Sequence, residues 1–193
     1  GVAVAWQMYA VTRDPLALGM VGLAEAVPFI GFALYAGHVA DRHDRKRVAL
    51  WAILILFFCA AALAAASALF LARGRSGTWI RWSIYAVIVV CGAARSFLLP
   101  ARNALGAELV PRSLYPSAVA WRTGSWQVAA VAGPLLGGLL YASAGPTVSY
   151  AVGGVLMATA LYTVAQIRAE ARPVRGREPL IASIRAGLTF LFN

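Results

Sequence analysis

Long apolar runs alternate with short polar segments along most of this chain of 193 residues. A membrane-spanning helix needs about 20 predominantly apolar residues. Runs that meet or approach this length cover residues 16–36, 48–72, 82–101, 117–142 and 147–167. Residues 2–11 are apolar but too short to span, and we interpret them as the end of a helix that begins outside this sequence. The pattern predicts an all-α fold, a polytopic membrane helical bundle.

The pattern changes near residue 168. The residues that follow are basic and contain proline, and residues 183–193 become apolar again. We therefore expect residues 1–168 to form the transmembrane bundle, with helix one partial and helices two to six present. Residues 169–193 are expected to form a cytoplasmic linker and the start of a seventh helix, so the chain is interpreted as a fragment.

Composition excludes a soluble domain. The chain is 61% hydrophobic and 12% charged, with a mean hydropathy of +0.74. Its formal net charge is +10, but the cations fall in the gaps between apolar runs and form no basic face or stripe. We therefore expect contact with the lipid bilayer and no nucleic-acid binding.

The segment Gly37–Arg47 joins two of the apolar runs and holds two aspartates and four cations. Such a polar turn cannot lie in hydrocarbon and must lie at a membrane face. Lys and Arg accumulate in short cytoplasmic loops, so we expect this segment to be cytoplasmic and the protein to be a multi-pass protein of the cell (inner) membrane.

This segment resembles a motif of the major facilitator superfamily, G-x-x-x-D-[RK]-x-G-x-[RK]-[RK], which lies between helices two and three. Asp44 stands where the motif has its second glycine, and Asp tolerates a left-handed turn better than most residues. The residues that fit the motif are Gly37, Asp41, Arg42, Arg45, Lys46 and Arg47.

A second resemblance lies in the run 117–142, where residues 133–138 read G-P-L-L-G-G. This is similar to the G-P-x-x-G-G motif in helix five of major facilitator antiporters, and it is carried by Gly133, Pro134, Gly137 and Gly138. The alternative is a plain packing motif, in which two small residues four apart let helices approach closely.

A third resemblance indicates a branch of the superfamily. Residues 99–104 read L-P-A-R-N-A, and residues 108–111 read E-L-V-P. They look like the connection between helices four and five in the enterobactin-exporter-like and macrolide-efflux-like branch. The resemblance covers nearly the whole chain, as the N-terminal six-helix half of that fold, with its inverted three-helix repeats.

The resemblance implies a secondary active transporter with a central cavity that opens alternately to each side. The implied activity is export of a small organic molecule, drug-like or siderophore-like, by proton antiport. The partners would be this small-molecule substrate, the coupling proton and the missing C-terminal half of the same chain. The alternatives are a uniporter or importer of the same fold, or a non-transporting membrane receptor or assembly subunit.

Charged residues inside spanning runs are functional candidates by default. Glu25 lies roughly 13 Å into the bilayer by helical rise, where a carboxyl group could carry a proton or could instead be neutral and hydrogen-bonded between helices. Arg95 and Arg122 each lie roughly 8–9 Å from the inner ends of their helices. We expect them to share a depth and to form an anion-attracting vestibule; the alternative is that both extend to the cytoplasmic interface. The further pathway candidates are Gln7, Trp126 and Gln127.

The resemblance also makes Gly37–Arg47 a candidate conformational latch, because helix two of the fold packs against helix eleven when the transporter is closed to the cytoplasm. Gly37 would let two backbones meet, and Asp41 would face the positive end of a helix. The alternative, a charged segment that only sets topology, explains the cations but leaves Gly37 and Asp41 unexplained.

No catalytic set is present, and we expect no enzyme activity, no cofactor and no metal. His38 and His43 lack the spacing of metal ligands, and there is no G-x-x-x-x-G-K-[ST] phosphate loop that would bind ATP. Cys59 and Cys91 fall inside apolar runs, where small buried hydrophobic residues are the simplest interpretation. Whether they face each other across neighbouring helices is left open by the sequence.

Overall fold

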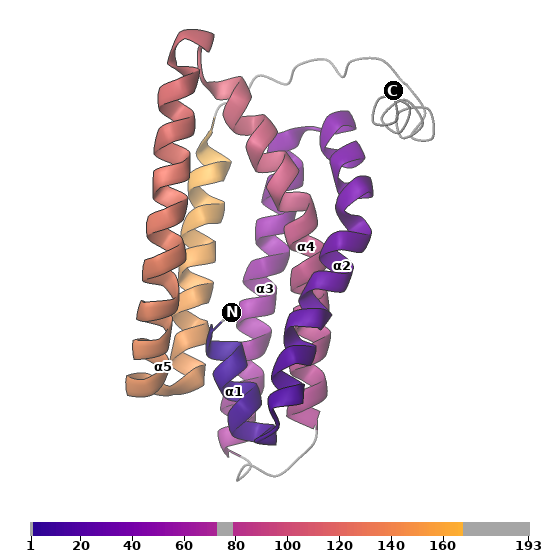
Figure 1. Cartoon of the computed structure of the whole chain (residues 1–193), viewed down its shortest axis with the longest axis vertical. Helices are drawn as coiled ribbons and strands as arrows, with labels where there is room; N and C mark the ends of the chain where they lie inside the picture. Colours follow the sequence, from indigo (N-terminus) through magenta and orange to yellow (C-terminus); the bar gives the residue numbers. More distant parts are fainter. Residues whose placement is uncertain (1, 73–78, 168–193) are drawn as a thin grey trace.

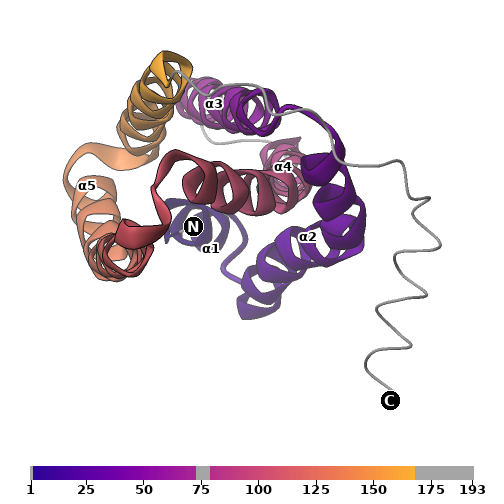
Figure 2. The same ribbon diagram turned by 90° about the horizontal axis from the view of Figure 1, so that it is seen from above.

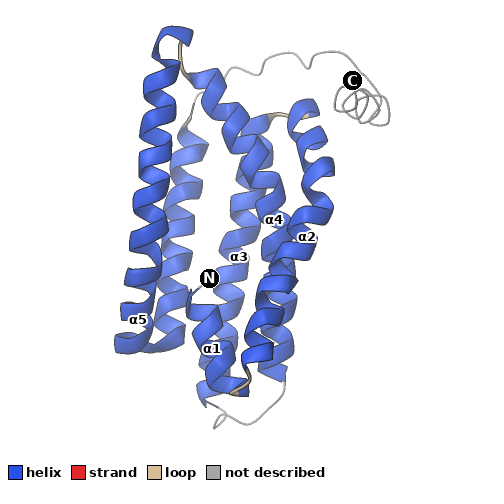
Figure 3. Cartoon of the chain, viewed as in Figure 1, coloured by secondary structure: helices blue, strands red, loops and turns tan. Residues whose placement is uncertain are grey.

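The computed structural model describes residues 2–72 and 79–167 (Figure 1). The predicted linker and helix start at residues 169–193 lie outside the described residues. No strand occurs in the part that is described, and the predicted all-α class is confirmed (Figure 3). The elements are α1 (Val2–Thr12), α2 (Pro15–Arg42), α3 (Arg45–Ala72), α4 (Trp79–Leu109), the 3₁₀ turn η1 (Arg112–Leu114) and α5 (Tyr115–Gln166).

The helices form one bundle with two distinct ends. Helix α4 packs against both α2 and α3, and α3 packs against α5 on its other side (Figures 1 and 2). The short α1 packs against α2, α4 and α5 at the lower end in Figure 1. The upper end carries the α2–α3 turn, the α4–α5 connection and the C-terminus of α5, and we call it the basic end. The lower end is called the opposite end.

Helix α5 is two antiparallel arms joined at one glycine. Gly145 has φ +80° and ψ 178°, a conformation that only glycine adopts easily, and Pro146 begins the second arm. The arms, residues 115–144 and 146–166, correspond to the two runs predicted there. Four helices, α2 to α5, are long and apolar enough to cross a membrane.

The helices extend further at the basic end than their apolar runs predict. Between α2 and α3 only His43 and Asp44 are outside a helix, so the expectation of an eleven-residue turn is wrong. The physical reason is a cap: Asp44 Oδ1 accepts hydrogen bonds from the backbone N–H groups of Lys46 (2.9 Å) and Arg47 (3.3 Å). Asp44, which stands where the motif has glycine, thus caps the N-terminus of α3.

The same correction applies to the predicted connection at residues 102–116. Helix α4 continues through Pro100 to Leu109, and only Val110 and Pro111 separate it from η1. Polarity alone ends a membrane run in a hydropathy pattern, whereas a helix can continue into the aqueous phase as long as its backbone hydrogen bonds continue.

Helices α2 and α4 approach each other closely at one glycine. Gly92 is buried on α4, and a Cβ atom there would overlap the backbone carbonyl of Glu25 and lie 2.9 Å from Cγ of Pro28. A larger residue at this position would force the two helices apart. Toward the opposite end the core contains larger side chains, and Met8, Ile80 and Ile84 are fully buried there.

We predict that Gly92→Ala destabilises the bundle by about 1–3 kcal/mol, the usual cost of overpacking a tight contact. Gly106→Ala is the matched control on the same helix, because nothing lies within 4 Å of the Cβ that it adds. In the control, the better helix propensity of alanine should be neutral or stabilising. Thermal unfolding of both variants in detergent checks this, and equal unfolding temperatures would contradict the close contact.

Candidate functional site

Two opposite charges meet between α2 and α4. Arg95 Nη1 of α4 donates to Oε1 of Glu25 on α2, and the two side chains form an ion pair. Glu25 lies about 15 Å along the helix axis from Pro15, and Arg95 about 21 Å from Leu109, at 1.5 Å per residue. Both groups therefore lie in the interior of their helices, far from the ends.

Helix α4 extends beyond Ala101, where its apolar run ends, to Leu109, so Arg95 lies farther from the end of the helix than from the end of that run. The expected depth of roughly 8–9 Å below the membrane face stays a prediction. The pair is also only partly enclosed, because the side chain of Arg95 is 53% exposed and that of Glu25 29% exposed. Each charge in the hydrocarbon region is costly alone, so the pairing neutralises the site while leaving it open to an incoming group.

The surroundings of the pair are set by the helix contact next to it. Gly92 lies one turn before Arg95, and its contact with the Glu25 backbone brings the two side chains within reach. Toward the basic end, Phe97 of α4 makes ring contacts with Phe32 and Tyr35 of α2, at centroid distances of 6.2 and 6.0 Å. Helix packing on both sides of the pair thus fixes its position.

Arg122 lies elsewhere. Its Nη1 donates to Oδ1 of Asn103 at 3.3 Å, and Asn103 is about 12 Å beyond Arg95 along α4. The structure therefore does not bring Arg95 and Arg122 together, and the vestibule expected from a shared depth is not formed by these two residues. Trp126 instead contacts Arg102, whose guanidinium carbon lies 5.5 Å from the ring centroid. Gln127 is exposed on the same arm of α5.

Gln7 is part of a buried polar network. Its Nε2 donates to Oγ of Ser67 at 2.6 Å, and its Oε1 accepts from the hydroxyl of Tyr150 at 2.6 Å. The side chains come from α1, α3 and the second arm of α5, and Gln7 is only 3% exposed. In an apolar bundle such paired polar groups hold helices in register. Sequence reasoning did not identify Ser67 and Tyr150, because a single hydroxyl in an apolar run gives no pattern.

The basic end is tied together by consecutive cations at the start of α3. Arg45 pairs with Glu108 of α4 at 2.5 Å, and Nζ of Lys46 donates to the carbonyl oxygen of Ala165, in the last turn of α5, at 2.8 Å. Both contacts satisfy groups near a helix C-terminus, where cations are favourable. Three helix ends are thereby connected within this one chain.

The remaining motif residues lie differently. Arg47 pairs with Asp44 at 3.4 Å within its own turn, and Arg42 ends α2. Asp41 is exposed, and nothing lies within 4 Å of a Cβ built on Gly37. These positions therefore leave room for another segment to approach.

The glycine–proline motif of α5 is open as well. Pro134 lies inside the first arm, and a Cβ atom built on Gly133, Gly137 or Gly138 would meet nothing within 4 Å. Its neighbours Leu135 and Leu136 are more than half exposed. The close helix contact that this motif predicts is not made among the described residues, and its role stays a prediction.

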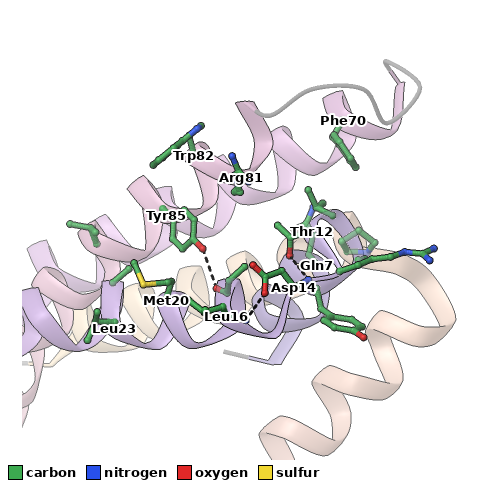
Figure 4. Close-up of a pocket in the computed structure, with 18 of the residues that line it drawn as sticks. Gln7, Thr12, Asp14, Leu16, Met20, Leu23, Phe70, Arg81, Trp82 and Tyr85 are labelled. Carbon is green, nitrogen blue, oxygen red and sulfur yellow. Dashed lines mark hydrogen bonds between the residues drawn. The ribbon is translucent and has the colours of Figure 1, made fainter.

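A cavity of about 1460 Å³ lies at the opposite end, between α1, α2 and α4 (Figure 4). Its wall is mostly apolar, and Tyr85 donates from its hydroxyl to the carbonyl oxygen of Ala17 at 3.1 Å across one side. Arg81 also lines it and lies over the Trp82 ring at 5.6 Å. Arg81 stands among aromatic residues at positions 79, 82 and 85, a local pattern that does not by itself predict a cavity.

The described residues contain no group of three or more side chains that could hold a metal ion. The opposite charges that the structure brings together in the interior of its long helices are those of Glu25 and Arg95. Both side chains can change partner without a covalent step.

Comparison with known proteins identifies the family. The family model described as transmembrane secretion effector, within the major facilitator superfamily, matches residues 1–192. The uncharacterised MFS-type transporter YfiS of Bacillus subtilis (strain 168) is 27% identical over 97% of this chain and 42% of its own length. Macrolide efflux protein A of Streptococcus pyogenes is 25% identical over 72% of this chain and 33% of its own length.

The chain thus spans less than half the length of these curated relatives. No solved structure matches it at comparable significance. The superfamily and the branch indicated by the motifs are confirmed, and both relatives are named as transport proteins rather than enzymes. A match over nearly every residue, on a bundle of membrane-length helices, means that this chain belongs to the transmembrane secretion effector family of the major facilitator superfamily.

Proposed function

We propose that the chain forms the N-terminal half of a secondary transporter that exports a small organic molecule in exchange for protons. The observation that carries this proposal is the partly exposed Glu25–Arg95 pair in the interior of membrane-length helices. Ionisable residues at such depth are costly, and they mark substrate or proton pathways. The efflux protein among the relatives supports the outward direction.

The Glu25–Arg95 pair also has a consequence for the charge of the substrate that can be exchanged for protons. In proton antiport, proton and substrate oppose each other's binding, and such a coupling is reciprocal. A substrate with a basic or hydrogen-bond-donating group would compete with the proton and with Arg95 for Glu25. An acidic substrate would compete with Glu25 for Arg95 and would therefore bind together with the proton. We accordingly propose a neutral or basic amphiphile, in place of the anion suggested by two arginines at one depth.

In this proposal the basic end faces the cytoplasm and the protein is a multi-pass protein of the inner membrane. Most of the cations on described residues lie at this end, as the distribution of Lys and Arg in membrane proteins favours. Those at the basic end are Arg42, Arg45, Lys46, Arg47, Arg102 and Arg112, against Arg13 and Arg81 at the other.

Contacts at the basic end reduce the number of residues that we propose for the latch. Arg45 and Lys46 bind groups of the same chain, so they stabilise this half rather than its junction with another. Asp41 and Gly37, which are exposed or open, are the residues proposed to meet the C-terminal half. The latch is then a contact of α2 alone, and α3 holds the surrounding helix ends in place.

Glu25→Gln tests the proton coupling. The amide keeps the shape of the side chain and a hydrogen bond to Arg95, but it cannot exchange a proton. In vesicles that hold the full-length protein, we expect uphill transport driven by a pH gradient to fall at least about tenfold, while downhill exchange continues. The substrate is chosen as a compound that accumulates in cells lacking the protein.

Glu108→Gln is the matched control, because Glu108 also pairs with an arginine, Arg45, but does so at the basic end. This control should retain the response to a pH gradient. Full gradient-driven transport in Glu25→Gln would contradict the assignment and would move the coupling to another part of the protein.

Asp41→Asn tests the latch. Loss of a charge–dipole interaction of about 0.3–1 kcal/mol should shift the population toward the cytoplasm-open state about two- to fivefold. Cysteine-accessibility labelling of the cytoplasmic cavity of the full-length protein measures the shift, and turnover should slow. Asp44→Asn is the control, because asparagine caps a helix as well as aspartate. If labelling and transport in Asp41→Asn both matched wild type, the latch hypothesis would be wrong, and the Gly37–Arg47 segment would only set the topology.

A further inference from the structure

The two cysteines of the chain meet between α3 and α4. The Sγ atom of Cys59 lies 4.0 Å from the carbonyl oxygen of Val87. Val87 is one turn before Cys91, and the side chain of Cys91 leans back over that turn, as helical side chains do. In an α-helix the carbonyl oxygen of Val87 accepts from the backbone N–H of Cys91, so Cys59 packs against the turn that carries Cys91, and both are free thiols. The open question of whether they face each other is thereby answered.

The thiol pair lies beside the charged pair but does not belong to it. Cys91 precedes Gly92, which contacts the Glu25 backbone, and it lies one turn before Arg95. Cys59 faces α4 from the other side and is 6% exposed. No third metal-ligating side chain joins the two sulfurs among the described residues, so the pair offers two sulfur atoms and nothing more. A four-coordinate ion such as zinc would be incompletely ligated here.

Cys91 is half-buried and Cys59 is 6% exposed, so the pair lies just beneath the surface of the bundle. The surface around it is apolar, because Phe58 is 60% exposed and Val90 is 46% exposed. Such apolar surface in a spanning segment contacts lipid tails. A ligand that reaches the thiols through the bilayer must therefore be neutral and apolar apart from its sulfur-binding atom.

We propose that Cys59 and Cys91 form a dithiol site that binds trivalent arsenicals carrying an apolar aryl group. A neutral aryl arsonous acid, R–As(OH)₂, reacts with two thiols to give R–As(SR′)₂ and two molecules of water. Each As–O bond is replaced by an As–S bond, each thiol proton leaves on a water molecule, and arsenic stays trivalent. The reaction needs no oxidant, no thiolate and no third ligand.

Juxtaposition of the thiols makes the adduct durable. With one thiol, the arsenic keeps a labile second position, and an external monothiol can displace it. With two thiols on packed helices, a broken As–S bond re-forms before the ligand leaves, because the second sulfur is held at a high effective concentration. A small external dithiol removes the ligand in both cases, since it offers the same chelation.

The test uses phenylarsine oxide as the probe, on the full-length protein in lipid vesicles. After labelling, the sample is challenged with glutathione and digested with trypsin, which cleaves at arginines between the two cysteines. Mass spectrometry should find the two cysteine peptides joined by one phenylarsenic group. Loss to glutathione should be at least about tenfold slower than from Cys59→Ser or Cys91→Ser, and ethanedithiol should release the group from all three proteins.

A variant with one thiol moved tests whether retention of the arsenic depends on the position of the two thiols or only on their number. Cys91→Ser combined with Val90→Cys keeps two thiols but moves one about 100° around α4. It should behave like the single-thiol variants, and thermal unfolding shows that each variant is folded. Wild-type protein that takes up no arsenic, that yields no joined peptides, or that loses the group as fast as the single variants would overturn the proposal. The same holds if the relocation variant retains the group as wild type does.

Discussion

The contact between α2 and α4 at Gly92 determines where charge can lie inside this bundle. Because Gly92 lacks a side chain, α4 reaches the backbone of α2 at Glu25, and Arg95 follows one turn later. A charge in hydrocarbon needs a partner, and helices kept apart by an ordinary side chain would not supply one at this reach. The ion pair therefore depends on this approach.

At the basic end, too, charged side chains bind partners within the same chain. Asp44 caps α3, and the cations that follow it bind Glu108 of α4 and the last turn of α5. The end of the bundle is thus fixed by contacts within the chain. Gly37 of α2 and the glycine–proline motif of α5 stay open, and small residues without close neighbours suit the approach of other helices.

Much of the fold could be predicted from the sequence, because apolar runs and turn residues are local signals. Within the described residues, the runs located helices α2 to α5, and the motifs identified the family. The predicted ends of α2 and α4 were wrong, because hydropathy indicates where the membrane ends and not where the backbone hydrogen bonds of a helix end. The sequence marked Glu25 and Arg95 as candidates but did not pair them, and the expected partner of Arg95 was Arg122. The depth of a residue in an apolar run does not show which helix faces contact each other. The network of Gln7, Ser67 and Tyr150 was invisible for the same reason.

The central claim is that proton and substrate compete at Glu25. Calorimetric titration of the full-length protein with its substrate, repeated in buffers of different ionisation enthalpy, measures the number of protons released on binding. We expect net release of protons when the substrate binds to the wild-type protein, and no such release in Glu25→Gln. Proton uptake on binding, or release that is unchanged in the variant, would contradict it.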